Sequence, residues 1–318
     1  MDDESVRPAW ESDEIPPMIF IVGLHRSGTT FLYETLSQVL PVAKLTVQNV
    51  VYYRALVASY FHDGGKQDEE SLTAYFDKHQ TKTRGRDALT LSPATAEEYG
   101  WILKAESGSY AIGKRSLSVL KDVADKLVFV NPDTQAVLLK NPWDTGNVNT
   151  LADEFPDARF IFLRRDPLEI LNSELGNLLY FTENRDPLIT LLTRQATDTR
   201  ISLTIARFLR VLLGRRLFSL LCIRLMSKDV ANNVQKFNLS LAGAHKDRTL
   251  EITYDDLVDS PKQTLELVAS FTELPVNHDV MSRISPKRRG VGLSPLVSDR
   301  EKYLREQLRI TDVRRLNT

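Results

Sequence analysis

Two glycines with four residues between them follow a short apolar run near the start of the chain. The run Met18–Val22 is rich in Ile and Val, and the loop from Gly23 to Gly28 carries a cation at Arg26. Glycines let the backbone approach an oxyanion, and the N-terminus of a following helix attracts it. Thr29 stands where ATPases and GTPases carry a lysine. We interpret the loop as a phosphate cradle, in preference to a tight turn with a solvated Arg26.

Two further cations follow apolar runs, at Lys140 and Arg165, and Ser173 stands eight residues after Arg165. Asp166 suits an N-cap and Pro167 suits the first helical turn, so a helix is predicted to begin there and to contain Ser173. Cations at the carboxyl ends of parallel strands lie where this architecture binds ligands. The alternative is a surface ion pair for Arg165 and an ordinary helix serine.

Two other groups of polar residues, at Glu98 and at 288–290, have a purely structural interpretation beside a functional one. Thr95, followed three places later by Glu98, predicts a capping box at the start of a helix. The basic segment with Arg288, Arg289 and Gly290 suits a mobile loop that clasps phosphate, or a solvated basic turn before a last helix at Arg300–Leu308.

The elements that must position these residues alternate along the chain. Strand patterns at 18–22, 134–140, 158–163 and 250–257 are separated by helical patterns. This alternation predicts an α/β, P-loop-like three-layer fold with a central parallel sheet flanked by helices. We expect a flexible acidic leader at 1–17 and a single domain at 18–318, with helical insertions at about 45–125 and 185–245.

The composition is that of an ordinary globular protein. Lys and Arg number 41 against 42 Asp and Glu, a balance that excludes a general nucleic-acid binder. The single cysteine, Cys222, cannot form an internal disulfide and favours a reducing compartment. The chain begins without a signal-peptide pattern and has no apolar run of the ~20 residues that a membrane span needs. We therefore expect a cytoplasmic protein.

A long helical stretch from Leu188 to Leu241 mixes arginines with Leu, Ile, Phe and Val and is interrupted at Gly214. We favour a pair of amphipathic helices with a solvated arginine face. The alternative is a surface that meets a membrane or a carrier-tethered substrate. The sequence therefore does not favour peripheral membrane contact, and it predicts no oligomeric state.

Four segments, in order, resemble one family: the sulfotransferases that use 3'-phosphoadenosine 5'-phosphosulfate (PAPS). The segment 24–30 resembles their 5'-phosphosulfate loop, with arginine in place of the usual lysine. Arg165 and Ser173 match the arginine and serine of their 3'-phosphate motif. The segments 139–143 and 154–161 resemble a largely bacterial branch, and Tyr254 begins a segment similar to a box near the adenine.

The resemblance implies the roles of individual residues. PAPS would be bound through a set of loop, helix and C-terminal residues: His25, Arg26, Ser27, Gly28, Thr29, Thr30, Arg165, Ser173, Tyr254, Arg288, Arg289 and Gly290. Arg26 and Lys140 would act on the sulfuryl group, PAP would be released, and no metal is implied. The acceptor would be a hydroxyl of a small or carrier-bound metabolite, in secondary metabolism.

The chain departs from the pattern at the general base. In the well-known cytosolic relatives a histidine follows the lysine by two positions, where this chain has Pro142. We choose Glu98 as the base, with Glu97, His62 and Asp144 as reserves. A carboxylate base would need its pKa raised by burial.

Two other functions remain open from the sequence. A small-molecule kinase with a P-loop fold would require ATP and Mg²⁺, and the missing loop lysine counts against it. A non-catalytic nucleotide-binding module docked to a membrane or an assembly is kept open by the missing histidine.

Overall fold

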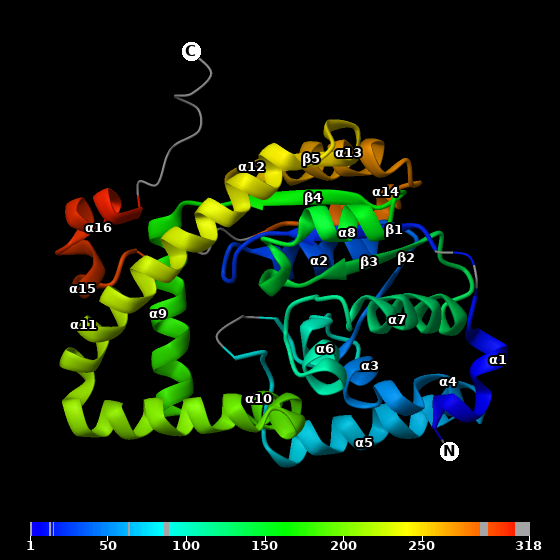
Figure 1. The fold of residues 1–318 in the computed structure, drawn as a ribbon, viewed down its shortest axis with the longest axis horizontal. Coiled ribbons are helices and arrows are strands. Elements are labelled where there is room, and N and C mark those ends of the chain that lie inside the picture. The colour runs from blue at the N-terminus through cyan, green and yellow to red at the C-terminus, as the bar shows by residue number, and fades with distance from the viewer. Residues whose placement is uncertain are drawn as a thin grey trace.

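A five-stranded, all-parallel sheet forms the centre of the computed structural model, which describes residues 2–12, 14, 16–62, 64–85, 89–286 and 292–308. The strand order is β2-β3-β1-β4-β5. Helices cover both faces (Figure 1), so the predicted three-layer α/β fold is confirmed. The strands are β1 Met18–Val22, β2 Val42–Lys44, β3 Ala136–Lys140, β4 Arg159–Arg164 and β5 Thr249–Thr253. Edge strand β2 was not predicted.

The two faces of the sheet bury different side chains, because side chains alternate along a strand. Ile19 and Ile21 pack into one apolar cluster, to which α2 (Thr29–Val39), α13 (Pro261–Thr272) and α14 (His278–Arg283) contribute. Phe20 and Val22 pack into a larger cluster on the other face, with α7 (Leu117–Val130), α8 (Val148–Glu154), α9 (Pro167–Glu183) and α11 (Thr197–Gly243).

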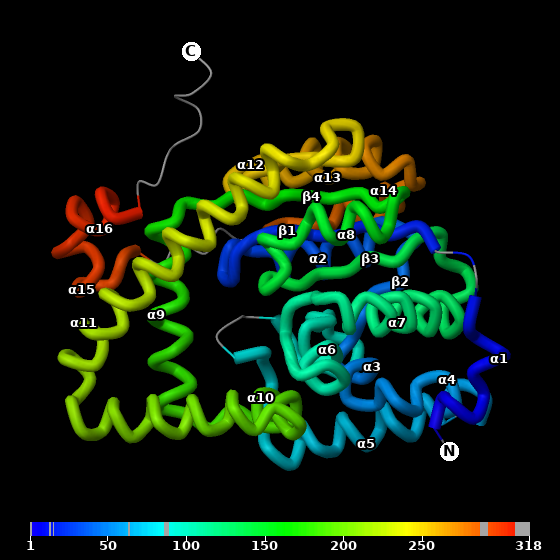
Figure 2. Tube along the Cα trace, viewed as in Figure 1, coloured from blue at the N-terminus to red at the C-terminus, as the bar shows by residue number. Residues whose placement is uncertain are grey.

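A further group of helices stands apart from the sheet (Figure 2). Val47, Leu72, Phe76 and Leu188 belong to a third apolar cluster, which joins α3 (Val47–Val51), α5 (Gly64–Lys78) and α10 (Pro187–Leu192). Both predicted insertions contribute to it. Other helices are α1 Arg7–Trp10, α4 Leu56–Phe61, α6 Gly100–Ser107, α12 Tyr254–Asp259, α15 Pro295–Ser298 and α16 Glu301–Leu308. The division into leader and domain stays a prediction.

The strand register gathers the predicted site residues at one edge. Lys140 ends β3 opposite Ile21, just before the glycine loop. The last residues of β4 and β5 also lie opposite each other, so Arg165 and Tyr254 leave the sheet side by side. Because all five strands run in the same direction, the loop, Lys140, Arg165 and Tyr254 emerge together.

The long helix α11 bends at Gly214, whose φ of 71° and ψ of 161° lie outside the helical region. A residue with a Cβ would be strained there. The predicted solvated arginine face is wrong in part. Arg207 donates to a backbone carbonyl of α9 at 3.1 Å and Arg210 lies 3.7 Å from an acid of α9, whereas Phe208 is 66% exposed and Val211 74% exposed.

The start of the chain is anchored, which differs from the expected flexible leader. Asp3 and Trp10 are buried. The Asp3 carboxylate lies 2.8 Å from the Lys126 ammonium and accepts from the backbone N–H groups of Val57 and Ala58, each at 2.9 Å. These contacts tie the described part of the leader to α4 and α7.

Replacing Asp3 by Ala should lower the free energy of unfolding by about 3–5 kcal/mol, because it leaves the buried Lys126 charge without its carboxylate. Urea denaturation measures this change. Glu4→Ala is the control: its side chain is 67% exposed, so its loss should cost less than about 1 kcal/mol. Equal effects of the two variants would contradict the anchoring role.

Candidate active site

The glycine loop between β1 and α2 has the shape of an anion cradle. Gly28 has a φ of 102°, and a Cβ at this position would lie 2.6 Å from the Tyr254 ring. Gly28 is also the N-cap residue of α2, and within the described part of the chain no side chain caps that helix. The first N–H groups of α2 therefore lack helical partners and can bind an anion. Ser27 stiffens the loop by donating its hydroxyl to the Leu24 carbonyl at 2.7 Å.

Three predicted residues meet on one side of the loop. Arg26 donates its Nε to the Ser173 hydroxyl at 3.2 Å. Arg165 donates to the backbone carbonyl of Arg26 at 3.0 Å, and its guanidinium lies 4.1 Å from the centre of the Tyr254 ring. Asp166 accepts from the backbone of α9 as the predicted N-cap. The two arginines and the serine can therefore face one anionic group.

Lys140, Glu98 and Thr30 meet on the other side. The Lys140 ammonium donates to the Glu98 carboxylate at 2.7 Å and to the Thr30 hydroxyl at 2.9 Å. Only 1% of the Lys140 side chain and 9% of the Glu98 side chain are exposed. Lys140 is thus a buried cation held at the start of α2, beside the cradle.

The predicted capping box is wrong. Helix α6 begins at Gly100, and the Thr95 hydroxyl accepts from the backbone N–H of Ser92 at 2.8 Å. Glu98 lies before the helix rather than in its first turn. The buried ammonium of Lys140 holds its carboxylate more strongly than a helix N-terminus would.

The electrostatics of this pair differ from the expectation for a base. Burial raises the pKa of Glu98, but the nearby charges, chiefly Lys140, outweigh it and leave that pKa below its ordinary value. The expected rise is therefore not observed. Burial lowers the pKa of His25, which leaves its imidazole neutral at neutral pH.

The reserve bases are engaged elsewhere. Glu97 is fully buried and lies 2.8 Å from Arg84. Asp144 accepts from the backbone N–H of Ile112 and from two asparagine side chains. His62 follows α4, which Figure 1 shows next to the N-terminus, away from the carboxyl ends of the strands.

Two features near the loop were not predicted. Burial raises the pKa of Glu174 to about 8, and the Asp229 charge adds to this rise while Arg26 opposes it. The His25 ring stands edge-on to Trp143 at 4.6 Å, and Trp143 stacks on Tyr110 at 4.5 Å. In the sequence, the one signal for the raised pKa of Glu174 is its position next to the predicted Ser173.

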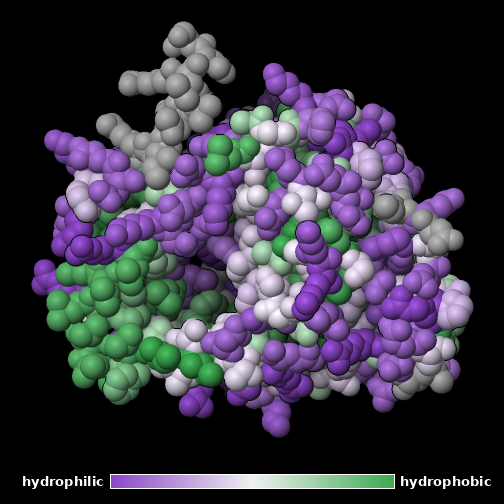
Figure 3. Space-filling model, in the orientation of Figure 1, coloured by the Kyte–Doolittle hydropathy of each residue, from purple (hydrophilic) through white to green (hydrophobic). Residues whose placement is uncertain are grey.

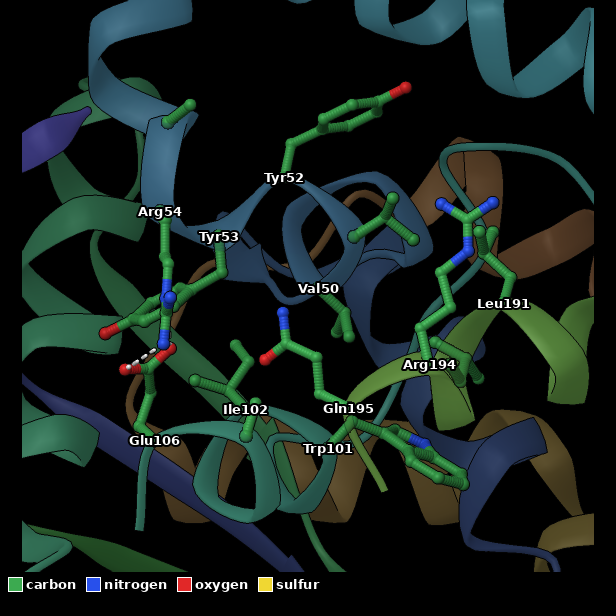
Figure 4. A pocket seen from close by; sticks show the side chains of 14 residues that line it. Val50, Tyr52, Tyr53, Arg54, Trp101, Ile102, Glu106, Leu191, Arg194 and Gln195 are labelled. Atoms are coloured by element: carbon green, nitrogen blue, oxygen red, sulfur yellow. Dashed lines mark hydrogen bonds and ion pairs between the residues drawn. The ribbon is translucent and has the colours of Figure 1, made fainter. Parts of the chain in front are cut away.

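A pocket of about 300 Å³ lies beside Trp101, whose ring also contacts Trp143. Figure 4 shows Tyr52, Arg194 and Gln195 around it, together with Ile102 of α6. Neither Lys140 nor Glu98 lines this pocket. Its walls combine apolar and aromatic side chains with the polar side chains of Arg54, Glu106, Arg194 and Gln195.

Some expectations cannot be followed in the structure. Arg288, Arg289 and Gly290 lie outside the described residues, so their phosphate-binding role stays a prediction. Within the described ranges, no group of three or more His, Cys, Asp or Glu side chains is arranged to hold a metal ion.

The structure thus combines a parallel α/β sheet with a glycine loop and converging cations at one edge. The family model for the sulfotransferase family matches residues 17–278, so the chain belongs to this family. No curated protein matches the chain. Its fold is similar to the crystal structure of sulfotransferase STF1 from Mycobacterium tuberculosis, at 18% identity and a TM-score of 0.58, over 96% of this chain and 80% of that one. It is also similar to STF9 from Mycobacterium avium, at 16% identity and a TM-score of 0.59, over 96% of this chain and 79% of that one.

Replacing Glu174 by Gln should stabilise the protein increasingly as the pH rises. Because the pKa of Glu174 is raised to about 8, the unfolded chain releases this proton at lower pH than the folded chain, and the wild type loses stability between about pH 5 and 8. The variant should gain on the order of 2–4 kcal/mol over that window. Chemical denaturation at both pH values measures it, with exposed Glu266→Gln as control. A constant difference between wild type and Glu174→Gln would contradict the shift.

Proposed function

We propose that this protein transfers a sulfuryl group from PAPS to a hydroxyl of a small or carrier-bound metabolite and releases PAP. Family membership supports sulfuryl transfer in general. The observation that carries the choice of donor is that two sets of hydrogen-bond donors meet at one glycine loop: Arg165 with Ser173, which both contact Arg26, and Lys140 with Thr30. PAPS has two anionic ends, and each group suits one of them.

The first group would hold the 3'-phosphate. Arg165 is fixed by the Tyr254 ring and by the Arg26 carbonyl, so its planar guanidinium is oriented before the ligand arrives. Ser173 adds a hydroxyl on the same side through its contact with Arg26. A fixed guanidinium and a hydroxyl are well suited to grip a phosphate dianion.

The cradle would hold the 5'-phosphosulfate. The N-terminal N–H groups of α2, the hydroxyls of Thr29 and Thr30, and Arg26 are the donors that this end would use. The loop needs no lysine after Gly28, because Lys140 brings an ammonium to Thr30 from the neighbouring strand. His25, beside Trp143, would close the margin of the cradle.

Bound PAPS would supply the sulfuryl group and a PAP leaving group. Lys140 and Arg26 would stabilise the negative charge that develops on the oxygen between sulfur and the 5'-phosphate as that S–O bond breaks. The acceptor oxygen would form the new S–O bond. Because Lys140 is buried, its charge would act in a site with little screening by water.

Glu98 would accept the proton of the acceptor. Its lowered pKa keeps the carboxylate ionised at neutral pH, and an anion that draws the Lys140 ammonium towards itself would weaken the pair and make Glu98 more basic. An acidic acceptor such as a phenol would need this base less. The pocket beside Trp101 could take the part of an acceptor that does not react.

PAP should bind to the purified protein with a Kd in the micromolar range or below, and Arg165→Ala should weaken this binding roughly 10- to 100-fold, through loss of a charge-assisted contact. Isothermal titration calorimetry measures both. Arg164→Ala is the matched control, because Arg164 pairs with Glu251 and Asn238 instead. Tight binding of ATP with Mg²⁺, without a response to PAP, would replace the proposal by the kinase alternative.

Lys140→Met should lower kcat for sulfuryl transfer at least 100-fold with a smaller effect on PAP binding, because its charge acts mainly on the transition state. The assay uses labelled PAPS with phenol and with the more acidic 4-nitrophenol as acceptors. Glu98→Gln should slow transfer to phenol more than transfer to 4-nitrophenol.

The control lysine is Lys121, which pairs with Asp125 on α7 and should be replaceable by Met without loss of rate. Equal losses for the two phenols in Glu98→Gln would assign Glu98 to positioning Lys140 rather than to proton transfer. Binding of PAP without transfer to any hydroxyl would favour the non-catalytic module.

A further inference from the structure

The first half of α11 exposes a continuous stripe of large apolar side chains. Ile201, Ile205, Phe208 and Leu212 are 54%, 54%, 66% and 67% exposed. Their spacing of three or four residues places them on one side of the helix. Single exposed apolar side chains are ordinary on a protein surface, but a contiguous group of this size indicates an interaction site.

The stripe continues beyond the bend at Gly214. Leu217, Leu221 and Leu225 are 61%, 44% and 60% exposed, again at helical spacing. In Figure 1 the two halves of α11 meet at one end of the molecule, and Figure 3 shows an apolar area at that end, bordered by polar residues. We refer to residues 201–225 as the exposed edge of α11.

The charged residues of this part of α11 itself have one sign, and Glu183 of α9 lies 3.7 Å from Arg210 and 3.5 Å from Arg215. Residues 199–228 contain six arginines and one lysine but no Asp or Glu. Arg200, Arg216, Arg224 and Lys228 are exposed; Lys228 falls within the angular range of the second apolar stripe, and Arg224 lies at its margin. Long cationic side chains can extend along an apolar surface and keep their charge at its margin.

The composition of the edge distinguishes among partners. A second copy of this chain would bring the same arginines against each other, with no acid in the segment to pair with them. Protein interfaces are enriched in aromatic residues and in Arg, and the edge carries Phe and Arg but neither Tyr nor Trp. Apolar Leu, Ile and Phe beside Arg and Lys match a helix that lies in the interface of an anionic lipid surface.

We propose that the exposed edge of α11 docks the protein on an anionic membrane surface, with the apolar stripe in the acyl boundary and the cations among the headgroups. Within the described residues, no helix is long and apolar enough to cross a membrane. In this proposal α11 lies on the membrane surface. This reverses the preference drawn from the sequence, because the apolar side chains that were expected to be buried face solvent. The proposal does not depend on the acceptor or on PAPS.

Vesicle co-sedimentation tests this proposal. The full-length protein should bind vesicles of phosphatidylcholine with phosphatidylserine and should bind pure phosphatidylcholine much less. Phe208→Ser with Leu212→Ser should weaken binding at least 10-fold. Arg216→Gln with Arg224→Gln should weaken it roughly 25-fold, at about 1 kcal/mol for each cation, and added salt should reduce that difference.

The matched control is Lys262→Gln with Leu267→Ser on α13, two exposed residues of the same types far from the edge, which should change binding less than about 2-fold. All variants lie on the surface and should keep the thermal stability of the wild type. Wild-type protein that leaves anionic vesicles unbound would overturn the proposal and leave the edge to a protein partner. So would variants that bind as the wild type does. A dimer in sedimentation velocity that Phe208→Ser with Leu212→Ser dissociates, without vesicle binding, would assign the edge to a second copy.

Discussion

The buried ion pair between Lys140 and Glu98 is the constraint on which the rest of the site depends. With 1% of its side chain exposed, the Lys140 ammonium would be costly without a compensating charge. Glu98 supplies that charge and Thr30 supplies a further acceptor, so strand β3, the start of α2 and the segment before α6 are held in one arrangement. Glu98 lies before α6, which begins at Gly100, and its carboxylate pairs with Lys140 instead of capping that helix.

A second constraint acts through the parallel sheet. Every strand ends at the same edge of the sheet. Cations that are far apart in the sequence therefore lie close together there, and this requires no direct contact between each pair of them. Arg165 is then fixed by stacking on Tyr254, and that ring lies where a Cβ on residue 28 would be. Gly28 is therefore needed for two reasons. It adopts the positive φ of the turn, and it leaves room for the Tyr254 ring that orients Arg165.

Helix α11 joins the site to the outer surface. One of its sides packs along α9, the helix that carries Ser173, and its other side is the exposed apolar edge. Gly214 permits the bend between its two halves. A surface that docks on a membrane would therefore be connected through α11 and α9 to Ser173 and the cradle.

The sequence by itself determined the α/β class, the glycine loop and the separation of Arg165 from Ser173, because each depends on local spacing within a strand, a turn or a helix. It also identified Lys140 at a strand end. Only the tertiary structure decided that Glu98 pairs with Lys140 instead of capping a helix, and that the start of the chain is anchored through Asp3. Only the tertiary structure also decided that the apolar side chains on one side of α11 are exposed to solvent. These outcomes depend on which charges and surfaces meet across long stretches of chain, and no pattern of neighbouring residues carries that information.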